Sequence, residues 1–241
     1  MRCFDIFNDK ERYQEKMKNK FEKIFEQLAD FHTLAGYDGW MIGACVYEQR
    51  EAENQEWNMK DCSKSEIVKE NANFAVMWNQ LELEGMHYQL ELHVVKPEVH
   101  GADISRQIVI EENAGIKEKT EENTDTGVGK SISFTHSDIL RFVDAVGDTN
   151  SIHRSVHAVV PGLLMVEWML DMWIKKQIET KSDIERQEGM PDSKTFICRF
   201  RFEKPVYVDE RLHVEVRNMR GKQVYECKRE DKEIVWNMRI L

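Results

Sequence analysis

The feature that most restricts the fold is an apolar segment that begins at Gly162 and continues to about Ile178. Drawn as a helix, it carries apolar side chains around nearly its whole circumference, interrupted by Glu167 and Asp171. A helix that is hydrophobic all round has to be buried, and this one lacks the uninterrupted apolar length that a bilayer span needs. We therefore expect a helix wrapped by a β-sheet.

Alternating apolar residues predict the strands of such a sheet on both sides of this helix. Two strands have clear inward faces, formed by Tyr88, Leu90, Leu92 and Val94 in one and by Phe196, Cys198, Phe200 and Phe202 in the other. Further strands are expected at 74–78, 106–111, 131–134, 212–216, 224–227 and 234–241, with a hairpin turn at 219–222. The apolar run 40–47 fits either a strand or the end of a buried helix, and the polar residues 48–72 give no clear signal.

Each half of the chain has its helix first and its strands afterwards. In the first half, apolar residues at spacings of three and four predict an amphipathic helix over 10–34, with a coiled coil as the alternative. In the second half, a helix from about Asp138 ends at Gly147 and leads towards the apolar helix. The pattern places the chain in the α+β class.

A polar stretch divides the chain into two expected domains. Residues 113–130 are rich in Glu, Thr, Lys and Gly and lack periodicity, which is typical of a linker. The domains on either side would be 1–112 and 131–241. A chain of 241 residues is long enough for two small domains that each bury a core. A second polar stretch, 181–193, is expected to be a loop.

Charge and cysteine content exclude several functions and partners. The net charge of −10, without any block dense in Lys and Arg, argues against a nucleic-acid partner. The five cysteines are scattered and never form a CxxC pair, so neither a disulfide framework nor a zinc site is indicated. The start of the sequence has no apolar core of a signal peptide. We expect a cytoplasmic protein that neither associates with a membrane nor binds a metal.

A polar cluster precedes the apolar helix: Asp148, Asn150 and His153 have the spacing D-x-N-x-x-H. In a turn that leaves a helix, this spacing can bring the carboxylate and the imidazole within reach of one bound water. An imidazole with a pKa of about 6.5 exchanges protons near neutral pH. Each residue alone also fits a plain turn, a helix cap or an ordinary histidine. Together, and placed before a buried helix, they favour an active site.

Pro161 and Gly162 open the buried helix and extend the candidate site. The first N–H groups of a helix lack internal acceptors, and the helix dipole favours negative charge there. Since Gly162 has no side chain, a substrate oxygen could approach its N–H, as in an oxyanion hole. The neighbouring residues Ser151, Val160, Pro161 and Leu163 are expected to contact the substrate.

Residues 131–241 resemble the MaoC-like domain family, the hot-dog-fold family of R-specific enoyl-CoA hydratases and 3-hydroxyacyl dehydratases. The matching text is FTHSDILRFVDAVGDTNSIH, then VVPGLLMVEWM, then FRFEKPVYVDERLHVEV. The resemblance implies Asp148 and His153 as the acid–base pair, Asn150 as a supporting residue and Gly162 as the donor to the thioester oxygen. It implies a CoA or acyl carrier protein thioester as substrate, with neither metal nor redox cofactor.

Two features of the loop depart from the family pattern. The family usually has proline after the asparagine, where this chain has Ser151, and the loop 154–160 is shorter than in most members, which would change the shape of the acyl pocket. By resemblance to tandem hot-dog enzymes, the first half is expected to be a degenerate partner domain that contributes sheet and part of the acyl tunnel. A homodimer is a further arrangement that the resemblance leaves open.

Other charged residues leave alternatives open. Glu167, Asp171 and Lys175 lie at i, i+4 and i+8 of the apolar helix. Another branch of the hot-dog fold, the thioesterases, uses a carboxylate on this helix, although a plain stripe of ion pairs fits as well. Arg199 and Arg201 point away from the phenylalanine face and would meet substrate phosphates or only water. After the hydratase and the thioesterase, a non-catalytic module that binds acyl thioesters is the third hypothesis.

Overall fold

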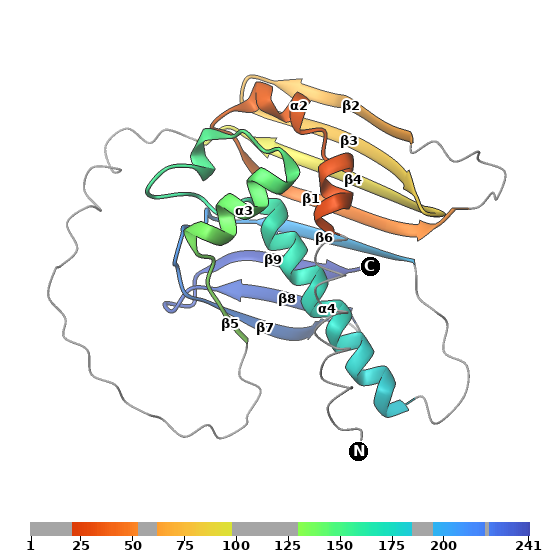
Figure 1. Cartoon of the computed structure of the whole chain (residues 1–241). Helices are drawn as coiled ribbons and strands as arrows, with labels where there is room; N and C mark the ends of the chain where they lie inside the picture. Colours follow the sequence, from red (N-terminus) through yellow and green to blue (C-terminus); the bar gives the residue numbers. More distant parts are fainter. Residues whose placement is uncertain (1–20, 53–61, 98–129, 185–194, 220–221) are drawn as a thin grey trace, which may run out of the picture.

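The computed structural model describes residues 21–52, 62–97, 130–184, 195–219 and 222–241 (Figure 1). In this part of the chain nine strands form one antiparallel sheet, in the order β2-β3-β4-β1-β6-β9-β8-β7-β5. The strands are β1 Met41–Glu51, β2 Cys62–Asn71, β3 Phe74–Leu83, β4 Met86–Val95, β5 Lys130–Ile132, β6 Phe196–Phe202, β7 Leu212–Met219, β8 Lys222–Lys228 and β9 Ile234–Ile240.

The strands of the two halves meet in the middle of this sheet. β1, from the first half, pairs antiparallel with β6, from the second, in a register that runs from Ala44 opposite Arg201 to Gln49 opposite Phe196. The sequence predicts a sheet around each helix, and the structure joins the two sets of strands into one continuous sheet. The α+β class is confirmed.

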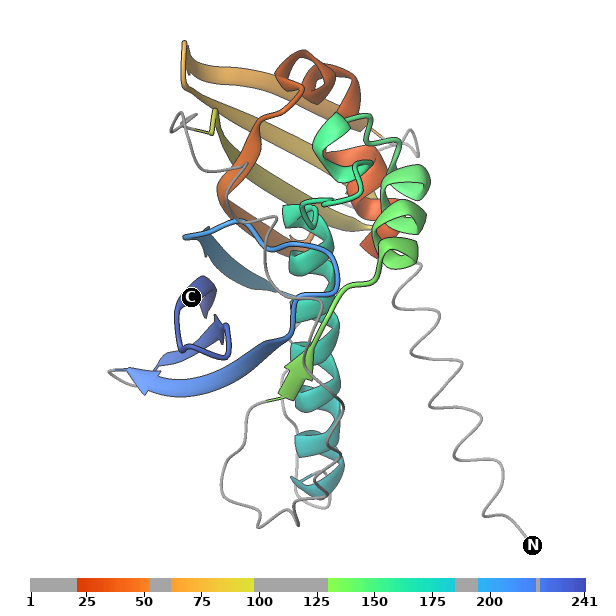
Figure 2. The same ribbon diagram turned by 90° about the vertical axis from the view of Figure 1, so that its left-hand side faces the viewer.

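The helices lie on one side of the sheet, which curves around the longest of them (Figure 2). They are a helix over 21–28, α2 Phe31–Leu34, the 3-10 helix η1 Ala35–Tyr37, α3 His136–Val146, the 3-10 helix η2 Ser151–His153 and α4 Gly162–Ile184. α4 is the predicted apolar helix, and its residues Val166, Met169 and Leu170 are fully buried. None of the described helices is long and apolar enough to cross a membrane.

Short-range signals account for the ends of α3. The Thr135 side chain accepts a hydrogen bond from the Asp138 N–H, and the Asp138 side chain accepts one from the Thr135 N–H, so the helix begins with a capping box. It ends at Gly147, whose φ of 76° is a left-handed conformation that glycine adopts without strain. The predicted inward residues Ile139, Phe142, Val143 and Val146 are buried, and Leu140 packs partly against the core.

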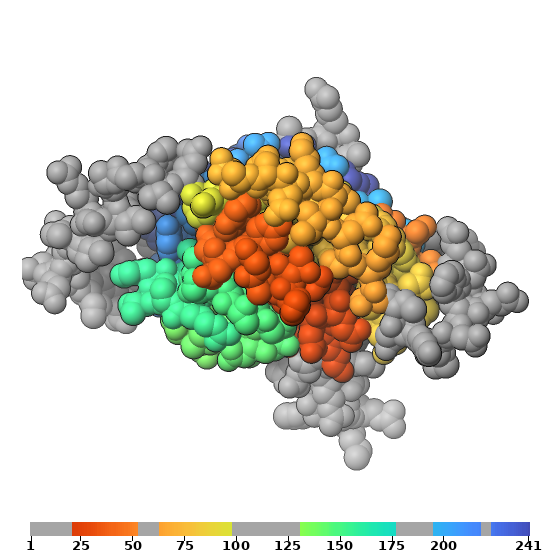
Figure 3. Space-filling model, turned by 90° about the horizontal axis from the view of Figure 1, so that it is seen from above, coloured from red at the N-terminus to blue at the C-terminus, as the bar shows by residue number. Residues whose placement is uncertain are grey.

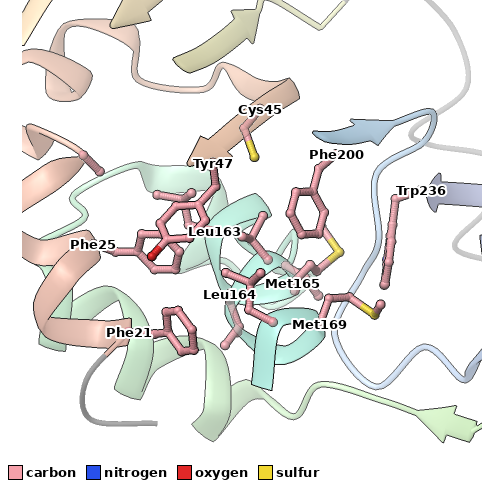
Figure 4. Close-up of a cluster of buried hydrophobic side chains, with 14 of the residues drawn as sticks. Phe21, Phe25, Cys45, Tyr47, Leu163, Leu164, Met165, Met169, Phe200 and Trp236 are labelled. Atoms are coloured by element: carbon pink, nitrogen blue, oxygen red, sulfur yellow. The ribbon is translucent and has the colours of Figure 1, made fainter. Parts of the chain in front are cut away.

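Both halves contribute to one hydrophobic core (Figure 4). Phe21 and Phe25 from the first helix lie edge-on to Tyr47 of β1, with ring centroids 6.4 and 6.0 Å apart. These rings meet side chains of α4, and Phe200 and Trp236 lie on the other side of that helix. The predicted face of β4 is also buried. The first half therefore packs directly against the helix that the second half provides.

The structure differs from the sequence-based expectations in four segments. The ambiguous run 40–47 is a strand, since it forms most of β1. β2 was not predicted, because its sequence is mostly polar; it is an exposed edge strand, where charged residues are common. The predicted first helix is interrupted at Asp30, whose φ is 40°. α4 continues to Ile184, into the predicted loop.

Several predictions fall outside the described residues. These are the first part of the helix at 10–34, the strand at 106–111, nearly all of the linker at 113–130 and the centre of the hairpin turn at 219–222. The strands on either side of that turn, β7 and β8, are paired as predicted.

Candidate active site

The loop after α3 is shaped by hydrogen bonds from its own side chains. The Asp148 N–H donates to the Val143 carbonyl at 2.8 Å, which completes the end of the helix. The Asp148 carboxylate then accepts from the Asn150 N–H at 2.9 Å, and the Asn150 side chain accepts from the Ile152 N–H at 3.3 Å. These are the local turns that Asp and Asn favour. They direct the chain into η2, where His153 is buried.

The Asp148 and His153 side chains face each other at the centre of this loop. Asp148 Oδ2 lies 3.6 Å from His153 Nε2, and the two side chains are only 13% and 9% exposed. His153 Nδ1 lies 2.7 Å from the Val159 carbonyl oxygen. A carbonyl can only accept, so Nδ1 carries the proton, and Nε2 of the neutral ring presents its lone pair towards the carboxylate. Two acceptors form no hydrogen bond with each other, so both remain available to a donor placed between them.

Burial sets the charge of the imidazole. Loss of solvent around His153 lowers its pKa below the ordinary value of 6.5, although the Asp148 carboxylate acts in the opposite direction and favours the charged ring. The folded protein therefore holds His153 mainly neutral at neutral pH. A neutral Nε2 beside a carboxylate is an arrangement in which one water molecule can donate a hydrogen bond to each acceptor.

The Asn150 amide connects this loop to the first half of the chain. Its Oδ1 accepts from the Gly39 N–H at 2.9 Å, and its Nδ2 donates to the Trp40 carbonyl at 2.8 Å. Beside it, the Ser151 N–H donates to Asp38 Oδ1 at 2.7 Å. These contacts engage both ends of the amide with backbone groups. Asn150 therefore holds the loop against Gly39 and Trp40, which lie far away in the sequence.

The first turn of α4 borders the same site. The Pro161 carbonyl accepts hydrogen bonds from the Leu164 and Met165 N–H groups at 3.1 and 3.2 Å, and the Gly162 N–H, at the start of the helix, has no acceptor within it. A Cβ atom at Gly162 would lie 3.1 Å from the Cβ of Ile42. Because Gly162 has no side chain, β1 can pack closely against the start of α4. This packing reason for the glycine is not visible in the sequence.

A cavity of about 170 Å³ brings the two halves together around this loop. From the second half its wall includes the candidate residues Asp148, Asn150, His153, Val160, Pro161, Gly162 and Leu163. From the first half it includes Phe31, Leu34, Tyr37, Trp40, Met41, Ile42, Gly43, Val94 and Val95. Figure 3 shows the first half, in red and orange, lying against the segment in green that carries α3 and the loop. Ser151 is exposed and does not line the cavity.

The resemblance to tandem hot-dog enzymes leads us to expect that the first half contributes part of an acyl tunnel, but sequence reasoning did not identify the residues that form the cavity wall there. Tyr37 and Trp40 stand edge to face with ring centroids 5.1 Å apart, and Phe31 and Leu34 of α2 lie beside them on the cavity wall. In the sequence, Phe31 and Leu34 belong to the predicted helix 10–34, and Trp40 begins the ambiguous apolar run 40–47. No local signal could indicate that these residues face a loop more than a hundred positions away.

The carboxylates on α4 lie elsewhere. Glu167 is 3% exposed and lines a second cavity, together with Arg141, Trp168 and Asp171. Asp171 forms an ion pair with Lys175 at 2.5 Å, one turn further along the helix, as the charge-stripe interpretation expects. The structure therefore does not bring Glu167 or Asp171 together with Asp148 and His153. Within the described ranges, no three His, Cys, Asp or Glu side chains are grouped closely enough to hold a metal ion.

Comparison with solved structures identifies proteins of similar fold. Two crystal structures of HtdX from Mycobacterium tuberculosis match 93% of this chain and 86% and 85% of HtdX, with TM-scores of 0.55 and 0.57 at 12% sequence identity. The full-length peroxisomal multifunctional enzyme type 2 from Drosophila melanogaster matches 88% of this chain over 40% of its own length, with a TM-score of 0.51 at 11% identity. The chain has the hot-dog fold of these proteins. No protein-family model matches the sequence, and no curated protein does.

Proposed function

We propose that this protein is an enzyme that adds water to trans-2-enoyl thioesters, giving R-3-hydroxyacyl thioesters, or catalyses the reverse dehydration. One observation carries the proposal: Asp148 and a neutral His153 face each other across 3.6 Å on the wall of a cavity that also borders the first turn of α4. The resemblance of the D-x-N-x-x-H segment to R-specific hydratases and the hot-dog fold support it. The substrate is a CoA or phosphopantetheine thioester, and the reaction needs neither metal nor redox cofactor.

In the proposed reaction a water molecule donates its two hydrogen bonds to Asp148 Oδ2 and His153 Nε2. The water oxygen forms a bond to the β-carbon of the enoyl group, one O–H bond breaks, and the proton passes to the Asp148–His153 pair. The pair then returns a proton to the α-carbon, so that one water is added across the double bond. General acid–base help of this kind contributes roughly 100- to 10,000-fold to the rate.

Negative charge moves to the thioester oxygen while the carbon–oxygen bond forms. The Gly162 N–H, which has no acceptor in its helix, is the proposed donor to this oxygen. The positive end of the α4 dipole stabilises the same charge. The apolar side chains of Phe31, Leu34 and Trp40 would accept the acyl chain and keep bulk water from the intermediate.

The test is an activity scan with enoyl groups of increasing length, each presented on CoA and on acyl carrier protein. Hydration is followed by the loss of ultraviolet absorbance of the conjugated thioester, and the product's configuration is determined by chiral separation. The Asp148→Asn and His153→Ala variants should each lose about 100- to 10,000-fold in kcat/KM while they keep the circular dichroism spectrum of the native fold.

The same assay separates the alternatives. Release of a free thiol that persists in Asp148→Asn and is lost in Glu167→Gln would indicate a thioesterase and refute the hydratase. Thermal stabilisation by acyl thioesters without any turnover would indicate a binding module, because a ligand that binds only the folded state raises its stability. Asp171→Asn, which changes a carboxylate outside the candidate site, serves as the control and should hydrate at the native rate.

A further inference from the structure

Three arginines form a basic surface on the outer face of the sheet, the face turned away from the helices. In β6 the side chains of Cys198 and Phe200 are buried in the core, so Arg199 and Arg201 point to the opposite face, where both are exposed. Arg239 of β9 stands directly opposite Arg199 in the sheet and is also exposed. We refer to Arg199, Arg201 and Arg239 as the outer arginine cluster.

The cluster is electrostatically unfavourable in the isolated chain. Like charges directly opposite each other on neighbouring antiparallel strands destabilise a sheet. Throughout the described residues no carboxylate forms an ion pair with Arg199 or Arg239, and Arg201 pairs only with Glu203, at 2.9 Å on the surface. In a chain with a net charge of −10, such a concentration of positive charge is not explained by composition.

Carboxylates on the flanking strands are engaged with other partners. Glu48 on β1 lies 3.6 Å from Arg50, and Glu226 on β8 lies 3.1 Å from both Lys228 and Arg217. The guanidinium groups of Arg199 and Arg239 therefore remain available to an anionic surface from outside, while Arg201 shares its charge with Glu203.

The cluster begins beside the candidate active site. Phe202, Glu203 and Lys204, which follow Arg201 in the chain, line the cavity. Arg201 also stands opposite Ala44, the neighbour of the cavity residue Gly43. Since a strand rises about 3.3 Å per residue, Arg199 lies roughly 7 Å further from the cavity than Arg201. The cluster thus extends from the cavity end of β6 across two strands of the outer face.

We propose that the outer arginine cluster docks an acidic acyl carrier protein, which delivers its acyl chain into the cavity as a phosphopantetheine thioester. This inference rests on the proposed function and names the substrate's carrier. Two acidic proteins repel each other, and a local basic surface offsets this repulsion and steers the encounter. Guanidinium groups suit this task because they bind carboxylates in a bidentate manner. A cluster spread over two strands matches a protein surface, whereas the phosphates of free CoA would need cations concentrated at the cavity mouth.

The test compares one acyl group, crotonyl, on acyl carrier protein and on CoA. Arg199→Glu and Arg239→Glu should each lower kcat/KM for the carrier-bound substrate by about 10-fold, mainly through KM, and the loss should shrink as salt rises. Activity on crotonyl-CoA should stay within about twofold of the native value. The control is Lys64→Glu on β2, at the far edge of the sheet, which makes the same change in charge and should affect neither substrate.

Three outcomes would overturn the docking surface. Equal losses on both substrates would mean that the cluster contributes to CoA binding or to thioester binding in general. Unchanged activity on both would mean that it has no role in either. An equal loss in Lys64→Glu would mean that the effect comes from the overall charge of the protein. If the native protein hydrates neither substrate, the proposed function fails and docking is decided by calorimetric binding of the carrier protein alone. Binding that weakens in Arg199→Glu supports docking, and absent or unchanged binding refutes it.

Discussion

At the scale of single residues, the proposed reaction depends on the protonation state of His153. The Val159 carbonyl fixes which ring nitrogen carries the proton, and burial disfavours a second proton, so that Nε2 stays available as an acceptor. Asp148 has the opposite influence, because its negative charge stabilises an imidazolium. The balance between these effects determines the pH range in which the candidate site can take a proton from water.

We predict that kcat/KM for the proposed hydration falls on acidification only below about pH 6.5, the ordinary pKa of histidine. The folded pKa of His153 is lowered, so the ring becomes charged only in more acidic solution. Nuclear magnetic resonance of the imidazole gives the same pKa without reference to activity. In the Asp148→Asn variant the titration should move to still lower pH, because the charge that raises the pKa is gone.

The same lowered pKa links His153 to stability. The contribution of the neutral ring is fully present above the unfolded pKa of about 6.5 and is lost as the pH falls through the folded pKa. The free energy of unfolding should therefore decrease on acidification in this range, and less so in His153→Ala. A titration of His153 above pH 6.5 would contradict both the assignment of the neutral ring and this linkage.

At the scale of elements, the start of α4 combines a proposed chemical task with a tight packing contact. We predict that Gly162→Ala lowers the free energy of unfolding by about 1–3 kcal/mol, because the new methyl group would lie 3.1 Å from the Cβ of Ile42. Chemical denaturation measures the change. Gly36→Ala is the matched control, since a Cβ at Gly36 meets no atom within 4 Å, and it should cost less.

A double variant shows whether the contact with Ile42 is the cause. Ile42→Ala alone removes apolar surface, and in the Gly162→Ala background it also removes the Cδ1 and Cγ1 atoms that would lie 3.3 and 3.6 Å from the new methyl group. The Cβ at 3.1 Å remains, so the crowding is relieved in part, and the double variant should lose less stability than the sum of the two single variants. Additive costs would mean that the glycine serves another purpose than the approach of β1.

Sequence patterns predicted most elements, and the exceptions have physical reasons. Alternation in β4 and β6 and the capping box of α3 are local properties, visible wherever one face is buried and the other is not. β2 lacks such a face, because it lies at the edge of the sheet with its side chains exposed, and its polar sequence gives no alternation. The break at Asp30 was missed because the apolar spacing continues across it.

At the scale of the whole molecule, one amide ties the halves together at the candidate site. We predict that Asn150→Ala lowers the free energy of unfolding by about 1–3 kcal/mol, since the Gly39 N–H and the Trp40 carbonyl both lose their partner. It should also reduce kcat, because the loop that carries Asp148 and His153 is no longer held. Denaturation curves and steady-state kinetics measure the two effects.

The matched control is Asn71→Ala, which removes an exposed hydrogen bond to the Asn73 N–H and should cost little. If Asn150→Ala were equally mild, the shared sheet, the core and the bond between Ser151 and Asp38 would suffice to hold the halves, and the amide would be dispensable for the site.

The candidate site was only partly visible in the sequence. Asp148, Asn150 and His153 lie within six positions of one another, so their spacing is a local motif that can be read directly. The partners of Asn150 lie 110 and 111 positions away, and the aromatic wall of Tyr37 and Trp40 shares no motif with the loop. Such long-range proximity arises from the pairing of β1 with β6, which no local pattern encodes.

The two halves of the chain contribute different parts of the cavity wall, and each part can change by mutation without the other. The candidate catalytic side chains come from one half, while α2, η1 and the start of β1 shape much of the space that a ligand would fill. Substitutions at positions such as Phe31 or Leu34 can therefore enlarge or narrow that space without touching Asp148 or His153. A protein built in this way can acquire new preferences by mutation in one half while the other preserves its chemistry, which makes the first half a natural target for both evolution and redesign.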